Sequence, residues 1–327
     1  MPTFCRHNRL LQNCAICSRE QAIEPRPLIS SSKPRTSEPR PHPSRPARTR
    51  GGAGARGSVR VSRLARGADD GYSSPLVPGL RSSEDARRLA DELAFAATRL
   101  EILAQDPPGL YAEIAAPDGD REERSWLAFL VAYLGPLDAP EPFTEIERIR
   151  TTWSSGEIPN LEDAQGGPRT AHDPARGTRA VEAYAGWARR AGSQTAAFAG
   201  DAAWTPERRF ERAFERLALP GLHRGARFDL LATLGWLRVY ELRPAKLQLG
   251  GGDEVTLAAK RALGIGDPLL LERRASELAS ACAIPLAALD LGFYNWERAE
   301  RTGAGVDPQL SPDAEVLERV SDALAVC

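Results

Sequence analysis

The sequence predicts a mainly α-helical protein. Runs of β-branched residues typical of strands are almost absent, and Ala, Leu, Arg and Glu, which favour helices, dominate the chain. Beyond residue 80, apolar residues recur at three- and four-residue intervals, as on one face of a helix. Because 42% of the 327 residues are apolar, we expect a buried core and either one large domain or two small ones, with tails.

The helices are predicted in order from their caps and apolar faces. Ser82 or Ser83 can cap the first helix, whose apolar face extends to Leu103. Thr205 can cap a later helix, because Pro206 suits its first turn. Residues 150–175 are loop-like. Further helices are predicted over residues 121–134, 178–191, 206–217, 226–234, 253–262, 268–282 and 285–300.

Residues 219–231 predict two helices joined by a tight turn. Pro220-Gly221 ends the helix over 206–217, and the helical period resumes at Ala226. A helix-hairpin-helix presents backbone N–H groups at its turn and at the start of its second helix, which can bind a nucleic-acid phosphate without reading sequence. An ordinary corner between helices is the alternative. The expected DNA contacts are Gly221, Leu222, His223, Arg224, Gly225 and Arg227.

The first residues predict a small zinc-binding module over 1–22. Four sulfur and imidazole ligands lie within thirteen residues, and a Cys-x-x-Cys pair is a usual zinc half-site. A full set of four ligands leaves no open position, so the Zn would be structural. A redox pair or incidental cysteines are the alternatives. The candidate ligands are Cys5, His7, Cys14 and Cys17.

The charge of the chain is unevenly distributed. Residues 26–66 hold eleven Lys or Arg and one acidic residue, whereas residues 67–327 hold 29 basic and 41 acidic residues. We therefore expect 23–79 to be a disordered, basic linker rich in Pro, Arg and Gly that can neutralise DNA phosphates. The helical domain then covers 80–302, and 303–327 form a C-terminal tail with room for one short helix. The arginines around the turn form either a basic patch or a solvated helix face.

The turn segment resembles the hairpin of the endonuclease III-like DNA glycosylase superfamily, whose pattern is Leu-Pro-Gly-x-Gly-x-x-Ala. The chain matches it at Leu219-Pro220-Gly221 and at Ala226, and has His223 at the second glycine. The resemblance implies a catalytic aspartate before a following helix, for which Asp253 is the best match and Glu254 the next. An ordinary helix cap is the alternative for Asp253. The lysine of bifunctional members falls on Gly225, so a Schiff-base lyase mechanism is not expected.

The order of elements narrows the resemblance. Cys5-Arg6-His7-Asn8-Arg9 with Cys14-Ala15-Ile16-Cys17, the hairpin, and Leu291-Gly292-Phe293-Tyr294-Asn295-Trp296-Glu297 together resemble the alpha-glutamyl/putrescinyl thymine pyrophosphorylase family, clade 3. The resemblance implies a glycosylase-like fold that acts on a hypermodified thymine of DNA. An amine such as putrescine or glutamate would displace pyrophosphate from a pyrophosphorylated 5-hydroxymethyl group.

Base-directed chemistry requires the base to leave the stack and enter a pocket. The aromatic side chains that could line it are Trp126, Tyr133, Tyr294 and Trp296, although aromatic residues at helical spacing more often belong to the core. A monofunctional DNA glycosylase and a non-catalytic DNA-binding adaptor are the alternative functions. No apolar run reaches the ~20 residues that span a bilayer and no signal peptide is visible, so the expected location is cytoplasmic.

Overall fold

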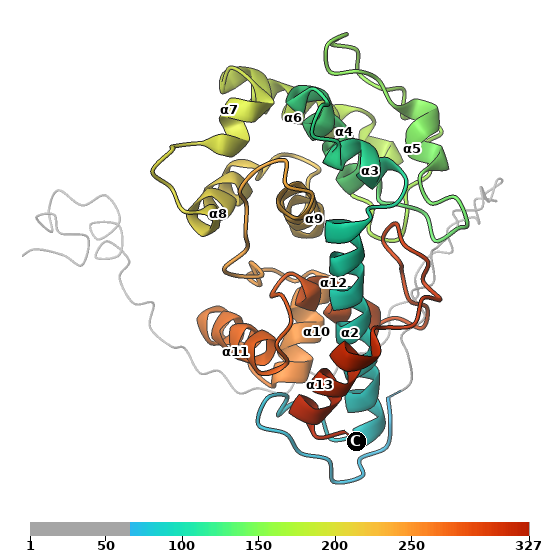
Figure 1. Cartoon of the computed structure of the whole chain (residues 1–327), viewed down its shortest axis with the longest axis vertical. Helices are drawn as coiled ribbons and strands as arrows, with labels where there is room; N and C mark the ends of the chain where they lie inside the picture. Colours follow the sequence, from blue (N-terminus) through green and yellow to red (C-terminus); the bar gives the residue numbers. More distant parts are fainter. Residues whose placement is uncertain (1–65, 327) are drawn as a thin grey trace, which may run out of the picture. The chain divides into compact units, whose positions relative to one another are not determined.

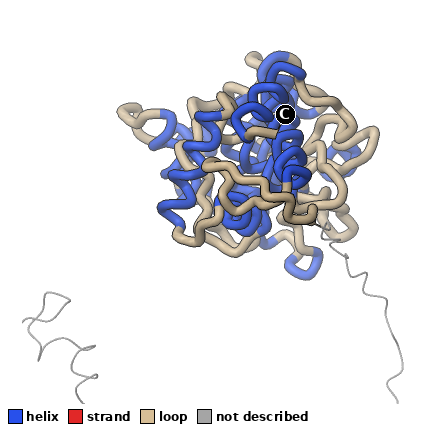
Figure 2. Tube along the Cα trace, turned by 90° about the horizontal axis from the view of Figure 1, so that it is seen from below, coloured by secondary structure: helices blue, strands red, loops and turns tan. Residues whose placement is uncertain are grey.

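A computed structural model describes residues 66–326 of the chain. This part consists of helices, turns and loops, with no β-strand (Figure 2). The predicted mainly α class is therefore confirmed. The expected zinc module and most of the expected linker lie outside the described residues.

The helix α2 (Ser83–Gln105) is the centre of a first group of helices. Ser82 caps it by accepting a hydrogen bond from the backbone N–H of Asp85, as the sequence predicted. α12 and α13 pack on α2, α10 packs on α12, and α11 packs on α10 (Figure 1). The remaining members are α10 (Glu254–Leu263), α11 (Pro268–Ala281), α12 (Ala288–Trp296) and α13 (Ala314–Leu324).

A second group is formed by the middle of the chain. Its core is a stack of aromatic rings centred on Phe129 and Tyr184, whose centroids lie 3.8 Å apart. α2 contacts α9, which joins the two groups. The helices of this group are α3 (Leu110–Ala115), α4 (Arg121–Leu134), α5 (Thr144–Ile149), α6 (Arg179–Arg190), α7 (Gln194–Ala199), α8 (Pro206–Arg216) and α9 (Arg224–Trp236).

Two boundaries differ from those expected. Residues 66–79, placed in the linker, lie against the helices: Val77 is fully buried and the Tyr72 hydroxyl donates to the carbonyl of Leu324. Within 303–327, the buried side chains of α13 pack on α2. In both places a few apolar side chains are enough to attach a short segment to the domain. Among residues 66–326, no helix combines the length and the hydropathy needed to cross a membrane.

Candidate functional site

The turn between α8 and α9 brings two helix ends close together. α8 ends at Arg216, and the backbone N–H of Leu222 donates to the carbonyl of Leu219 within the turn. Gly221 has a φ of +82°, a conformation that favours glycine, and a Cβ on it would lie 3.0 Å from the Cβ of Ala180. The turn is therefore tight and closely packed against α6.

His223 stands where the resembled hairpin pattern has its second glycine, and it caps α9. Its φ of −71° is open to any residue. Its Nδ1 accepts from the backbone N–H of Ala226, and its Nε2 lies 3.1 Å from the carbonyl oxygen of Thr170. These partners fit a neutral ring whose Nε2 carries the proton. His223 thus ties the start of α9 to the loop before α6.

A pocket of about 360 Å³ opens beside this turn. Four segments that are distant in sequence line it: residues 168–170, the start of α9 over 223–225, the start of α10 over 253–255, and the end of α12 with Tyr294 and Arg298. The structure therefore places Asp253, Glu254 and the exposed face of the turn on one cavity. Its wall carries three guanidinium groups and two carboxylates.

Asp253 lies on the pocket wall and also caps α10. Its Oδ1 accepts from the backbone N–H of Thr256 and from Nε of Arg224, 2.9 Å away, and its Oδ2 accepts from the Thr256 hydroxyl at 2.7 Å. Burial acts to raise the pKa of this carboxyl, but Arg224 and the hydrogen bonds of Thr256 outweigh burial and hold the pKa below its usual value. Asp253 is therefore ionised at neutral pH.

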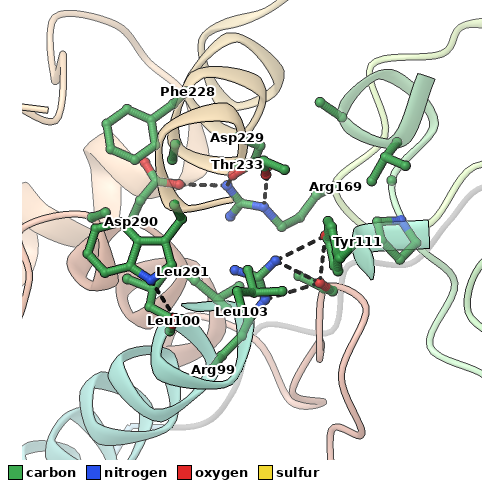
Figure 3. A pocket seen from close by; sticks show the side chains of 18 of the residues that line it. Arg99, Leu100, Leu103, Tyr111, Arg169, Phe228, Asp229, Thr233, Asp290 and Leu291 are labelled. Carbon is green, nitrogen blue, oxygen red and sulfur yellow. Dashed lines mark hydrogen bonds and ion pairs between the residues drawn. The ribbon is translucent and has the colours of Figure 1, made fainter. Parts of the chain in front are cut away.

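Behind the pocket, a buried charge network continues from Asp253. Arg224 links Asp253 to Asp290, because its Nη1 lies 2.7 Å from Asp290 Oδ2. Nη2 of Arg169 donates to Asp290 Oδ1 at 2.6 Å (Figure 3). Nε and Nη2 of Arg169 also donate one hydrogen bond each to the two carboxylate oxygens of Asp229. Both arginine side chains are 7% exposed and that of Asp290 is 2% exposed. Three carboxylates and two guanidinium groups thus alternate along a chain whose middle is buried and whose ends, Asp253 and Asp229, are 30% and 31% exposed.

Tyr294 forms the aromatic part of the pocket wall. The guanidinium carbons of Arg169 and Arg298 lie 4.7 and 4.8 Å from its ring centroid, and its hydroxyl donates to the carbonyl of Pro168. Burial raises the pKa of this phenol to about 12. Glu254 pairs with Arg298 at 3.0 Å at the rim of the pocket.

The other three aromatic candidates for a base pocket do not line this cavity. Trp126 stacks on Phe129 in the aromatic core of the second group. Tyr133 is 1% exposed and bonds His172 through its hydroxyl. Trp296 is 2% exposed and donates to the carbonyl of Asp85. All three serve the packing of the core, the alternative that their helical spacing left open.

The six expected DNA contacts divide into two sets. Gly221, His223 and Gly225 are at least partly exposed, and their backbone N–H groups donate no hydrogen bond within residues 66–326. Leu222, Arg224 and Arg227 have their side chains turned inward: Leu222 is 4% exposed, Arg224 is paired as above, and Arg227 lies over the ring of Phe214. A phosphate bound at this turn would therefore be contacted by backbone N–H groups rather than by these side chains.

The arginines around the turn, for which a basic patch and a solvated helix face were the alternatives, include both buried and exposed side chains. Arg209 is buried and binds the carbonyls of Ala199, Trp204 and Glu241. Arg212 pairs with Glu215, and the guanidinium groups of Arg208 and Arg216 lie over Trp204. Arg209 therefore stabilises the second helix group. The exposed Arg208, Arg212 and Arg216 lie on a solvated helix face, the alternative to a basic patch.

The candidate zinc ligands Cys5, His7, Cys14 and Cys17 lie outside the described residues. Within 66–326, no three or more His, Cys, Asp or Glu side chains are grouped so that they could hold a metal ion.

Arg169 and Asp290 are site residues that the sequence reasoning missed. Arg169 lies in the loop over 150–175, where no periodicity marks it. Asp290 carried a signal, since it is the one charged residue in the apolar helix α12, and aspartate is rarely buried without a partner.

No protein-family model, no curated protein and no solved structure matches the chain.

Proposed function

We propose that the chain binds DNA through the turn between α8 and α9 and acts on an extruded base in the pocket beside Asp253. The observation that carries the proposal is that Asp253 and the exposed residues of the turn, His223 and Gly225, line the same cavity. A phosphate held at the turn would bring its own nucleotide to the carboxylate.

The turn supplies the donors that a DNA phosphate needs. Unpartnered N–H groups at Gly221, His223 and Gly225 stand at the start of a thirteen-residue helix, where the helix dipole also favours an anion. Such backbone contacts fix the position of the duplex without reading its sequence. Leu222, buried beneath the turn, keeps its shape.

The pocket has the size and polarity for a substituted base. Its volume of about 360 Å³ is within the range typical of small-molecule sites. Arg169 and Arg224 on its wall are buried and already paired with Asp229, Asp290 and Asp253. Arg298, which is 23% exposed and pairs with the exposed Glu254, suits a substituent that carries negative charge, such as a pyrophosphate. This feature favours the reaction implied by the family resemblance.

In that reaction the nitrogen of an amine attacks the 5-methylene carbon of the modified thymine. A C–N bond forms, the C–O bond to pyrophosphate breaks, and the attacking nitrogen loses one proton. Asp253 is the first candidate to orient the amine, with Glu254 the second, and the proton passes to solvent. Arg298 would balance part of the charge of the departing pyrophosphate.

A monofunctional glycosylase is the second candidate. It is favoured by the lowered pKa of Asp253, because a carboxylate that stays ionised can stabilise positive charge on the sugar as the N-glycosidic bond breaks. A lyase step through position 225 has no support: a Cβ there would lie 3.3 Å from the ring of His223. A non-catalytic adaptor requires Asp253 to face open solvent, whereas Asp253 lines a pocket.

The test offers the protein a duplex that contains pyrophosphorylated 5-hydroxymethyluracil, together with putrescine or glutamate. Pyrophosphate release with an amine joined to the base supports the first reaction, and a free base with an abasic site supports the second. Asp253→Asn keeps shape and most hydrogen bonds, so turnover should fall by about 100-fold or more while DNA affinity is equal or slightly better.

Asp267→Asn is the matched control, because Asp267 caps α11 as Asp253 caps α10 but does not line the pocket. Gly221→Val should weaken DNA binding, and Gly156→Val, at another positive φ but in open space, should not. Full activity of Asp253→Asn would move the assignment to Glu254. If Gly221→Val and Asp253→Asn are both silent, the turn is only a corner of the core and the proposal fails.

A further inference from the structure

A second cavity lies behind the pocket, where the two helix groups meet. It is largely enclosed and holds about 50 Å³, room for about four waters at 10–15 Å³ each. Its walls come from α2, α3, α4, α9 and α12, and leucines such as Leu100 and Leu291 make much of the lining apolar. Arg169 is the one residue that lines both this cavity and the Asp253 pocket.

The cavity contains hydrogen-bond donors that have no acceptor. Figure 3 shows the guanidinium group of Arg169 reaching into it. Nη1 of this side chain, which is 93% buried, has no hydrogen-bond partner among residues 66–326. Arg99 enters from α2. Its Nε and Nη2 bind the carbonyl of Ala304 and its Nη2 also binds the hydroxyl of Tyr111, but its Nη1 donates to no described group.

The acidic groups at the cavity do not use these donors. Both oxygens of Asp229 already accept from Arg169, and the two oxygens of Asp290 are divided between Arg169 and Arg224. Arg99 forms no ion pair with any carboxylate among residues 66–326. Among the described residues that line the cavity, the buried side-chain atoms without a hydrogen bond are Nη1 of Arg169 and Oδ2 of Asp290. The charge of Oδ2 is balanced by the ion pair with Arg224, so the guanidinium groups of Arg169 and Arg99 are the ones that require an acceptor.

From this excess of donors we propose that the cavity is a binding site for a small oxyanion, held by Nη1 of Arg169 and Nη1 of Arg99. The volume suits a phosphate or a small carboxylate better than a group as large as a nucleobase. A metal cation would meet two guanidinium groups and is disfavoured. Because Arg169 also faces the Asp253 pocket, an anion here would add negative charge behind the wall of that pocket.

Calorimetric titration of the full chain with inorganic phosphate, at constant ionic strength and without DNA, tests this site. The expected result is saturable binding of one phosphate, with acetate binding at the same site in competition. Thymidine monophosphate distinguishes a free anion from a phosphoryl group carried on a larger ligand. If thymidine monophosphate binds and Arg99→Gln weakens this binding, the site takes the phosphoryl group of a larger ligand. Binding of free phosphate alone would indicate an independent ion.

Arg99→Gln should weaken phosphate binding at least tenfold. Arg88→Gln is the matched control, because Arg88 is a half-buried arginine of the same helix that does not line the cavity. Ala232→Val provides a second variant, since it fills the cavity while every arginine remains, and it should also abolish binding. Thermal unfolding of each variant without ligand establishes that it folds.

Two results would overturn the proposal. One is the absence of saturable binding of any oxyanion, which would mean that the cavity holds water only. The other is binding that is lost in Arg298→Gln but kept in Arg99→Gln, which would place the anion in the Asp253 pocket instead. Neither result bears on turnover with modified DNA, so this inference and the proposed function can fail separately.

Discussion

Replacing Asp290 by asparagine removes the central charge of the buried network. Asp290 lies 2.6 Å from Nη2 of Arg169 and 2.7 Å from Nη1 of Arg224, and all three side chains are at least 93% buried. Asparagine keeps the size but leaves the two guanidinium groups without the carboxylate between them. Removal of one partner from a buried ion pair typically costs about 3–5 kcal/mol. Because Arg169 keeps Asp229 and Arg224 keeps Asp253, we expect the lower end, about 3 kcal/mol.

The free energy of unfolding at pH 7, from equilibrium denaturation in urea, measures this loss. Glu215→Gln is the control, because Glu215 and its partner Arg212 have side chains that are 55% and 48% exposed. Exposed pairs contribute about 0–1 kcal/mol, and salt screens them. The cost of Asp290→Asn should therefore persist at 1 M NaCl, a screening length of about 3 Å, whereas any effect of Glu215→Gln should vanish.

A loss of less than about 1 kcal/mol for Asp290→Asn, below the range for a broken buried pair, would refute this reasoning. It would mean that Asp229 and Asp253 suffice to balance the two arginines, or that water enters the network. A changed dependence on urea concentration would instead indicate that the substitution alters the compactness of the unfolded or the native state.

Other measurements address the metal, the linker and two ionisable side chains. Elemental analysis of the reduced protein should find one zinc per chain, and metal-free protein would contradict the predicted module. Deleting 26–66 should flatten the dependence of DNA affinity on salt, and an unchanged slope would exclude the linker as a contact. Burial raises the pKa of the Cys282 thiol to about 11, so the native protein treated with an alkylating reagent at pH 8 should leave Cys282 unmodified, as checked by mass spectrometry. The contribution of the protonated thiol to stability should be lost as the pH rises from 9 to 11. The pKa of Asp253 is lowered, so the ionised carboxylate contributes fully to the free energy of unfolding above pH 3.8, and this contribution is lost as the pH falls below that value. In acid unfolding, the stability of Asp253→Asn should therefore fall less with pH than that of the unsubstituted protein.

The long helices could be predicted because their signals are local. α4 begins and ends where the apolar spacing placed it, and Ser82 and Thr205 cap their helices as expected. The helices α3, α5 and α7 were not predicted. Each has six residues, fewer than two turns, so no repeat of apolar positions can develop. Such helices depend on packing against their neighbours rather than on their own sequence.

The candidate site was only partly predictable. Asp253 and the turn were singled out, and the structure places them on one pocket, but their use in DNA chemistry stays a prediction. Trp126 and Tyr184 show why aromatic residues mislead: the same spacing serves a core stack and a ligand pocket, and only the three-dimensional arrangement distinguishes them. The same holds for arginines, since Arg209 resembles a DNA contact in sequence and is a buried structural residue.

The hydrogen bonds of Asp253 identify the oxygen that remains for chemistry. Oδ1 accepts from both Arg224 and the backbone of Thr256, whereas Oδ2 accepts from the Thr256 hydroxyl alone. A carboxylate oxygen has two acceptor sites, so Oδ1 is saturated and Oδ2 keeps one. A substrate would therefore meet Oδ2. Asp290 pairs with Arg224, and Arg224 in turn donates to Oδ1 of Asp253. The direction in which Oδ2 points therefore depends on Asp290, a residue of α12 that does not line the pocket.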